Sequence, residues 1–170
     1  MVTELTGQEN KEPRVSGTED RAEGQGMLQN RFARHRLDEE RIDTALKTIF
    51  ALLQSQELVS FAYLHGSVLD FQRGEQSVLP HDIDVAIYLT EGDWVSVELE
   101  LQSEFYRRTG LSPEVFDVHA LNSAPVTAAM EIIRRGKLLF CRDPLQHADF
   151  LECVSNSCRR LAGILEVAHA

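Results

Sequence analysis

Four short runs of strand-forming residues alternate with segments whose apolar residues recur every three or four positions. Strands are typically about five or six residues long, whereas a helix buries one stripe of residues at its own period. The strand candidates are Val59–His65, Asp82–Leu89, Val115–Leu121 and Lys137–Cys141. This alternation predicts an α/β (α+β) chain with a small mixed β-sheet flanked by helices.

The predicted helices occupy the segments around and between these runs. The first carries one apolar stripe, formed by Ile42, Ala45, Leu46, Ile49, Phe50 and Leu53. A second is expected over Asp93–Thr109. A third begins after Asn122 or Ser123, either of which can cap it, and ends at Gly136. A final helix follows Pro144, and residues 66–81 are expected to form a long loop.

The N-terminal segment differs in composition from the rest of the chain. Residues 1–26 are polar and contain few large apolar side chains, so they cannot bury enough surface to become ordered. The remaining length is sufficient for one domain with a core of its own. We therefore expect a disordered tail over residues 1–26 and a single domain over residues 27–170.

Charge and hydropathy narrow the range of partners. The net charge is −10, whereas nucleic-acid-binding proteins usually carry a basic excess, so direct nucleic-acid binding is disfavoured. No apolar run approaches the roughly 20 residues that span a bilayer, and the N-terminus has no apolar signal core. A cytoplasmic protein without a membrane partner is expected. The three cysteines include no C-x-x-C pair, which favours reduced, structural thiols.

Two aspartates stand at the head of the second strand candidate. Asp82 and Asp84 are two residues apart, so in a strand they share a face and repel each other unless a cation lies between them. Asp117 lies in the third strand candidate, and it joins them if the two strands are neighbours. Three carboxylates of this kind suit two Mg²⁺ ions that act in phosphoryl transfer. Taken alone, the Asp-x-Asp pair is more typical of solvent-facing acids at a loop edge.

A glycine-serine pair directly follows the first strand candidate. Gly66 allows the backbone to approach a phosphate closely, and the Ser67 hydroxyl can donate a hydrogen bond to it. Such a pair is a weak signal by itself. The ordered combination of strand, Gly-Ser, Asp-x-Asp strand and a strand-borne aspartate is far more specific.

This combination resembles the nucleotidyltransferase superfamily that includes DNA polymerase β. Its signature is matched in order by Gly66-Ser67, Asp82, Asp84 and Asp117. The segments HDIDVAIYL, VFDVHALNSAP and RRGKLLFCRDPLQHADFLE resemble the corresponding segments of the minimal, MNT-type members. These members include the MntA-type antidotes of HEPN toxins, and the likeness runs from about residue 58 to residue 165.

The resemblance implies a polymerase β-like fold and transfer of AMP from ATP, with Mg²⁺, to a tyrosine hydroxyl of a HEPN-type toxin. It implies that Asp82, Asp84 and Asp117 are the catalytic and metal-binding residues and that Gly66 and Ser67 bind the triphosphate. Two alternatives stay open. One is a small-molecule acceptor such as an aminoglycoside, and the other is an antitoxin that acts by contact with a catalytically weak site.

The chain departs from the family pattern between the serine and the first aspartate. The family usually continues Gly-Ser-x-Ala-Arg-Gly, whereas this chain has Val68, Leu69 and Asp70 and a longer connection. Arg73 and Gly74 are candidates for a displaced Arg-Gly pair.

Several histidines and arginines lie close to these motifs in the sequence. For His65, His81 and His119 the interpretations are a transition-metal site, phosphate contact or support of Asp117, and ordinary hydrogen-bonded or exposed side chains. The arginine pairs 107–108 and 134–135 end two predicted helices, which favours a role at the helix dipole over a partner or phosphate contact.

Overall fold

The computed structural model describes residues 37–168. The elements follow the predicted alternation, with one additional short helix and a 3₁₀ turn. They are α2 (Glu39–Ser55), β1 (Val59–His65), α3 (Gly66–Gln72), β2 (Ile83–Leu89), α4 (Trp94–Thr109), η1 (Pro113–Val115), β3 (Phe116–Ala120), α5 (Val126–Arg135), β4 (Lys137–Cys141) and α6 (Pro144–Ala168). The predicted tail over residues 1–26 and the start of the domain at residue 27 lie outside the described residues.

The strands form a single mixed sheet in the order β3-β2-β1-β4. β1 pairs antiparallel with both β2 and β4, whereas β2 and β3 run parallel. A parallel pair needs a crossover connection, and α4 provides it between β2 and β3. The predicted fold class, a small mixed sheet flanked by helices, is confirmed.

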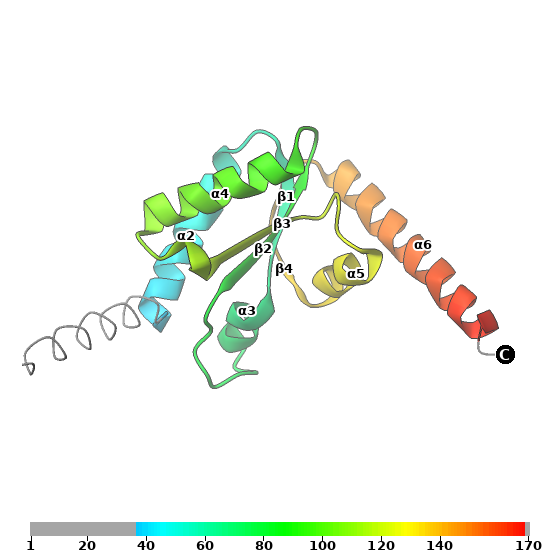
Figure 1. Cartoon of the computed structure of the whole chain (residues 1–170), viewed down its shortest axis with the longest axis horizontal. Coiled ribbons are helices and arrows are strands. Elements are labelled where there is room, and N and C mark those ends of the chain that lie inside the picture. The colour runs from blue at the N-terminus through cyan, green and yellow to red at the C-terminus, as the bar shows by residue number, and fades with distance from the viewer. Residues whose placement is uncertain (1–36, 169–170) are drawn as a thin grey trace, which may run out of the picture. The chain divides into compact units, whose positions relative to one another are not determined.

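Two apolar clusters cover the two faces of this sheet. The larger cluster joins α2, α3 and α4 to one face, and the smaller joins α5 and α6 to the other. Figure 1 shows α2 and α4 on one side of the strands and α5 and α6 on the opposite side. The sheet is therefore the central layer of the fold, with helices packed on both of its faces.

Alternation along β2 shows how the sequence assigns these faces. Ile83, Val85 and Ile87 are fully buried in the larger cluster. Each contributes about 1.5–3 kcal/mol through removal of its side chain from water. Because successive side chains point to opposite faces, Asp84 lies on the other face, on the side of α5 and α6. The apolar stripe that stabilises the fold thus also fixes the direction of the acidic side chain.

The prediction of a continuous loop over residues 66–81 is wrong. Its first seven residues form α3. Val68 and Leu69 are buried in the larger cluster, and Phe71 packs against it. Burial of these neighbouring side chains stabilises a helix that is too short to show a clear helical period in the sequence.

Asn122 does not cap α5, contrary to one of the two predicted possibilities. Pro125 precedes α5, and no side chain caps that end. The amide of Asn122 instead accepts a hydrogen bond from the Leu89 N–H and donates one to the Leu89 carbonyl, both at 2.9 Å. Ser123 donates only to the Ala120 carbonyl, at 3.4 Å. Asn122 therefore ties the connection after β3 to the end of β2.

Replacing Asn122 with alanine is expected to lower the free energy of unfolding by about 2 kcal/mol, because two hydrogen bonds of about 1 kcal/mol each are lost. Urea unfolding followed by circular dichroism measures this change. Ser123→Ala is the matched control, with an expected loss below about 0.5 kcal/mol, since that residue is exposed and its bond is long. Equal losses in the two variants would contradict the role of the Asn122 amide.

The outer edge of β3 is covered by side chains of α4. The Glu98 carboxylate accepts a hydrogen bond from the Ala120 N–H at 2.6 Å, and the Gln102 amide donates to the Phe116 carbonyl at 2.6 Å. Ala120 and Phe116 are the last and first residues of β3. An open edge strand offers such groups to another chain, so these two side chains protect both ends of the edge.

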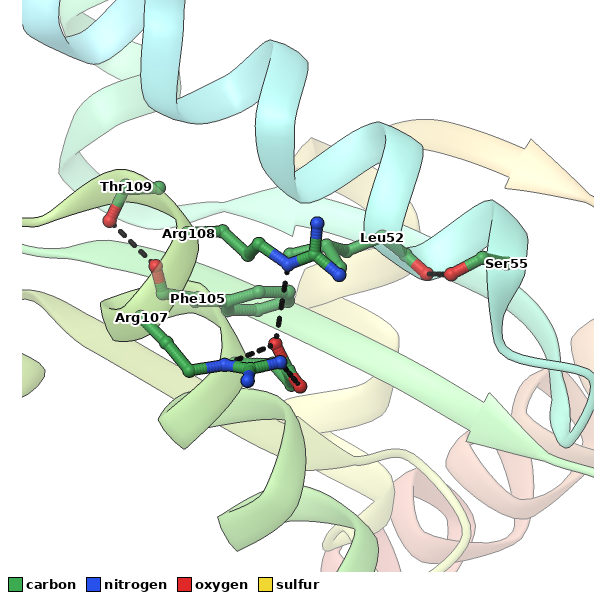
Figure 2. A network of polar contacts seen from close by, with 7 residues as sticks. Leu52, Ser55, Phe105, Arg107, Arg108 and Thr109 are labelled. Atoms are coloured by element: carbon green, nitrogen blue, oxygen red, sulfur yellow. Dashed lines mark hydrogen bonds and ion pairs between the residues drawn. The ribbon is translucent and has the colours of Figure 1, made fainter.

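The arginines at the end of α4 are engaged within the helix. Arg107 forms hydrogen bonds and an ion pair with Glu104, and Arg108 lies 3.6 Å from the same carboxylate. Figure 2 shows both guanidinium groups turned toward this carboxylate, beside the Thr109 hydroxyl that donates to the Phe105 carbonyl. Arg107 and Arg108 therefore lie in the last turn of α4, where both pair with Glu104.

Two further predictions concern membrane-spanning helices and the cysteine thiols. In the region that the structure describes, no helix is long and apolar enough to cross a membrane. Cys141, Cys153 and Cys158 are all free cysteines, as predicted.

Candidate active site

The register between β2 and β3 places Asp84 directly beside Asp117. The two residues are partners in the parallel ladder, and both side chains are partly exposed. Paired backbones in neighbouring strands lie about 4.8 Å apart. His65, the last residue of β1, is the partner of Asp84 on its other side. Three adjacent strands therefore direct polar side chains to one place on the sheet.

Asp82 approaches the same place from the residues before β2. Its Oδ1 atom accepts a hydrogen bond from the Ser67 hydroxyl at 3.2 Å. Ser67 lies in the first turn of α3, which directly follows β1. This bond brings the glycine-serine pair and the first aspartate together, although fifteen residues separate Ser67 from Asp82.

Gly66 lies against Asp84 and leaves no room for a side chain. Its φ angle is +73°, and a Cβ atom built on it would lie 1.9 Å from Oδ2 of Asp84. A left-handed backbone of this kind favours glycine, and the close approach excludes any other residue without displacement of Asp84. The backbone after β1 therefore forms one wall of the acidic site.

The electrostatics show that the three carboxylates act on one another. Burial, together with the Asp82 and Asp117 carboxylates, raises the pKa of Asp84 from its ordinary value of 3.8 to about 6. A cation between the carboxylates would reverse this effect, because an opposite charge favours the ionised form. Part of the rise in the Asp84 pKa therefore comes from the negative charge of its two neighbours.

The donor atoms fit a hard divalent ion. Carboxylate oxygens are the ligands that Mg²⁺ prefers, and it usually takes one or two of them together with water and phosphate oxygens. Within residues 37–168, no three histidine, cysteine or acidic side chains already converge as a ligand set. Asp82, Asp84 and Asp117 are all partly exposed, and their carboxylates must turn toward one another to share an ion.

Two of the three histidines lie at this site. The Nε2 atom of His119 is 2.8 Å from Oδ1 of Asp117. The Nε2 atom of His65 is buried without a hydrogen-bond partner. Burial and, to a lesser extent, His119 lower the pKa of His65, whereas Asp117 raises it. His81 is exposed. The structure thus gives the three histidines different environments.

Arg73 belongs to a different cluster, at the end of α5. Its guanidinium donates a hydrogen bond to the Arg135 carbonyl at 2.8 Å. The Arg135 side chain lies 3.4 Å from Asp70 and 3.5 Å from Glu131. These contacts hold α3 against the end of α5. The sequence did not predict the contact between Arg135 and Asp70, because no local pattern relates residues so far apart.

A separate cavity lies on the other side of α3. Its volume is about 520 Å³, and its lining includes Asp43, Leu69, Arg73 and Lys137. None of the three site aspartates lines it. The acidic site is therefore not part of this cavity.

The site combines a Gly-Ser turn, an Asp-x-Asp segment leading into β2 and a third aspartate on the parallel strand β3. This combination is typical of nucleotidyltransferases. Residues 47–145 match the family described as Polymerase beta, Nucleotidyltransferase. That match covers more than half of the 170 residues, and the chain belongs to this family. No curated protein sequence matches the chain.

Solved structures with the same fold include toxin–antitoxin complexes. One is a chain from the complex of tri-AMPylated Shewanella oneidensis HEPN toxin with MNT antitoxin. It is 18% identical, with a TM-score of 0.54, over 76% of this chain and 99% of that chain. A chain from a toxin–antitoxin complex with AMP-PNP is 19% identical, with a TM-score of 0.51, over 79% of this chain and 100% of that chain. A chain from the MntA-HepT toxin–antitoxin complex is 18% identical, with a TM-score of 0.52, over 75% of this chain and 99% of that chain. At these identities the likeness establishes the fold.

Proposed function

We propose that the protein is a Mg²⁺-dependent nucleotidyltransferase that moves AMP from ATP to a tyrosine hydroxyl of a HEPN-type toxin and thereby neutralises it. The observation that carries this proposal is the convergence of Asp84 and Asp117 on paired strands, with Gly66 against Asp84 and Ser67 bonded to Asp82. The fold shared with an MNT antitoxin in complex with an AMPylated HEPN toxin supports the choice of acceptor. The fold shared with a complex that contains AMP-PNP supports the choice of donor.

Asp82 and Asp84 would hold the metal ions, and Asp117 would share the ion nearest the acceptor. Bound there, Mg²⁺ would neutralise charge on the phosphates and lower the pKa of the attacking hydroxyl. The Gly66 backbone lies against Asp84, so a phosphate whose metal ion is bound by the carboxylates would also lie beside this backbone. The Ser67 hydroxyl, in the same turn, could donate a hydrogen bond to that phosphate. This chain's own contribution is therefore orientation of the triphosphate and a place for the departing proton.

The reaction balances without a redox partner or a further co-reactant. The acceptor oxygen forms a bond to the α-phosphorus of ATP, and the bond from that phosphorus to the bridging oxygen breaks. Pyrophosphate leaves with the electron pair of the broken bond. The hydroxyl proton moves to the Asp117 carboxylate, which lies on the exposed side of the site with half of its side chain accessible.

Labelled ATP tests the proposal directly. The protein is incubated with α-labelled ATP, Mg²⁺ and the purified product of the adjacent reading frame, and label on that product is expected. Asp82→Asn should reduce the labelling at least about 100-fold, whereas Asp149→Asn, which replaces an exposed acid on α6, should leave it within about twofold.

Two results would overturn the proposal. One is the absence of label on a partner that the protein nevertheless inhibits, which would indicate an antitoxin that acts by contact alone. The other is equal labelling by the wild type and Asp82→Asn, which would place the chemistry outside the acidic site. Transfer of label to a small alcohol but not to the partner would instead support a small-molecule acceptor.

A further inference from the structure

We propose that His119 is a positioning residue that orients the Asp117 carboxylate for nucleotidyl transfer, an inference that rests on the proposed function. The Nε2 atom of His119 lies 2.8 Å from Oδ1 of Asp117. The contact engages one carboxylate oxygen and leaves the other, Oδ2, for an ion or for the acceptor proton. Side chains that support a metal-binding residue commonly fix its orientation in this way.

The strand geometry explains why His119 can perform this role. Asp117 and His119 are two residues apart on β3, so their side chains share the face that carries the site. The ladder partner of His119 is Ala86, whose small side chain is buried in the cluster beneath α5 and α6. The imidazole therefore has no bulky neighbour at its own ladder position, and it reaches back along the strand to Asp117.

The other histidines near the site lack this contact. His65 is the ladder partner of Asp84, but its Nε2 atom is buried without a hydrogen-bond partner. His81 directly precedes Asp82 and is exposed. Of these histidines, His119 alone is paired with a site carboxylate. Its side chain is also 56% exposed, so replacing it should disturb the orientation of Asp117 far more than the stability of the core.

Because half of the Asp117 side chain is also exposed, nothing in the sheet core holds its carboxylate. A carboxylate free to rotate spends much of its time away from the reactive orientation, and small misplacements are costly in catalysis. Loss of the His119 contact should therefore affect the rate of the chemical step more than the binding of ATP. In the proposed site, nucleotide binding would depend mainly on Gly66 and Ser67, which lie against Asp84 and Asp82.

Three variants separate orientation from simple structural damage. His119→Ala is expected to lower kcat about tenfold and leave the KM for ATP within about twofold. His119→Gln should recover most of kcat, because its amide nitrogen reaches nearly the position of Nε2. Asp149→Asn, which replaces an exposed acid on α6, is the control, and its kcat should stay within about twofold of the wild type.

Mn²⁺ binding gives a readout that does not depend on transfer. Electron paramagnetic resonance of the nucleotide-free protein titrated with Mn²⁺ should show about tenfold weaker binding for His119→Ala, with recovery in His119→Gln. If the wild type transfers no AMP, the proposed function is wrong. If His119→Ala nevertheless binds Mn²⁺ more weakly than that wild type, the inference that His119 orients Asp117 is still supported. The inference is overturned if His119→Ala binds Mn²⁺ as the wild type does, or if an active wild type loses no kcat in this variant.

Discussion

Asp84→Asn is expected to abolish nucleotidyl transfer and, at the same time, to make the folded protein more stable near pH 8. Asp84 lies between Asp82 and Asp117, and its pKa is raised to about 6 by burial and by those two carboxylates. In the absence of a cation the ionised side chain is therefore unfavourable in the folded state. An asparagine keeps the shape and removes the charge, but it no longer attracts the metal ions.

The direction of the pH dependence follows from the raised pKa. Between the unfolded value of 3.8 and the folded value of about 6, the folded protein binds more protons than the unfolded chain, so stability falls as the pH rises through this range. At 1.36 kcal/mol per pKa unit the full effect would be about 3 kcal/mol. Because Asp84 is partly exposed, solvent screening reduces the expected gain in Asp84→Asn to about 1–2 kcal/mol at pH 8.

Urea unfolding at pH 8 and pH 4 measures this gain, which should nearly vanish at the lower pH. Labelling of the partner should fall at least about 1,000-fold, equivalent to about 4 kcal/mol in the activation barrier. Asp149→Asn is the control for loss of a surface charge and should change neither quantity appreciably. A variant that is inactive and also less stable than the wild type at pH 8 would contradict the charge repulsion inferred for the site.

Gly66→Ala is the second substitution with a large expected effect. The added Cβ atom would lie 1.9 Å from Oδ2 and 2.7 Å from Cγ of Asp84, so that carboxylate has to move. The φ angle of +73° adds the cost of a left-handed backbone, about 1–2 kcal/mol for a residue other than glycine. Activity should fall at least about 100-fold, because misplacement by about 1 Å alone has an effect of this size.

The loop after α3 offers a close control for this prediction. Gly74 has the same φ angle, +73°, but an added Cβ atom would meet nothing within 4 Å. Gly74→Ala should therefore show the backbone cost of about 1–2 kcal/mol and retain activity within about threefold. Urea unfolding and the labelling assay are measured on both variants. Equal activity of the two would show that the close approach of Gly66 to Asp84 is unimportant for transfer.

The strands could be predicted from the sequence because each is a contiguous pattern. Val59–His65 and Lys137–Cys141 were predicted with the bounds that the structure has. Prediction of the face of Asp84 needed only the alternation with Ile83 and Val85. The meeting of Asp84 with Asp117 depended on an assumption, that the two strands are neighbours, which the parallel register bears out.

What the sequence did not predict depends on contacts between distant residues. α3 is stabilised by burial of Val68 and Leu69 rather than by a helical period of its own. The amide of Asn122 prefers the backbone of Leu89, 33 residues away, to the nearby start of α5. The contact between His119 and Asp117 was only one of several interpretations, because sequence spacing does not give the direction of an imidazole ring.

The covered edge of β3 limits how a protein acceptor can be recognised. With the Ala120 N–H and the Phe116 carbonyl already bonded to α4, an incoming segment would find both ends of the β3 edge occupied. A protruding acceptor side chain is then the simpler way to reach the carboxylates from this side. Selection of the correct partner would then depend on surface shape and charge elsewhere on the two proteins, separately from the chemistry proposed for the three aspartates.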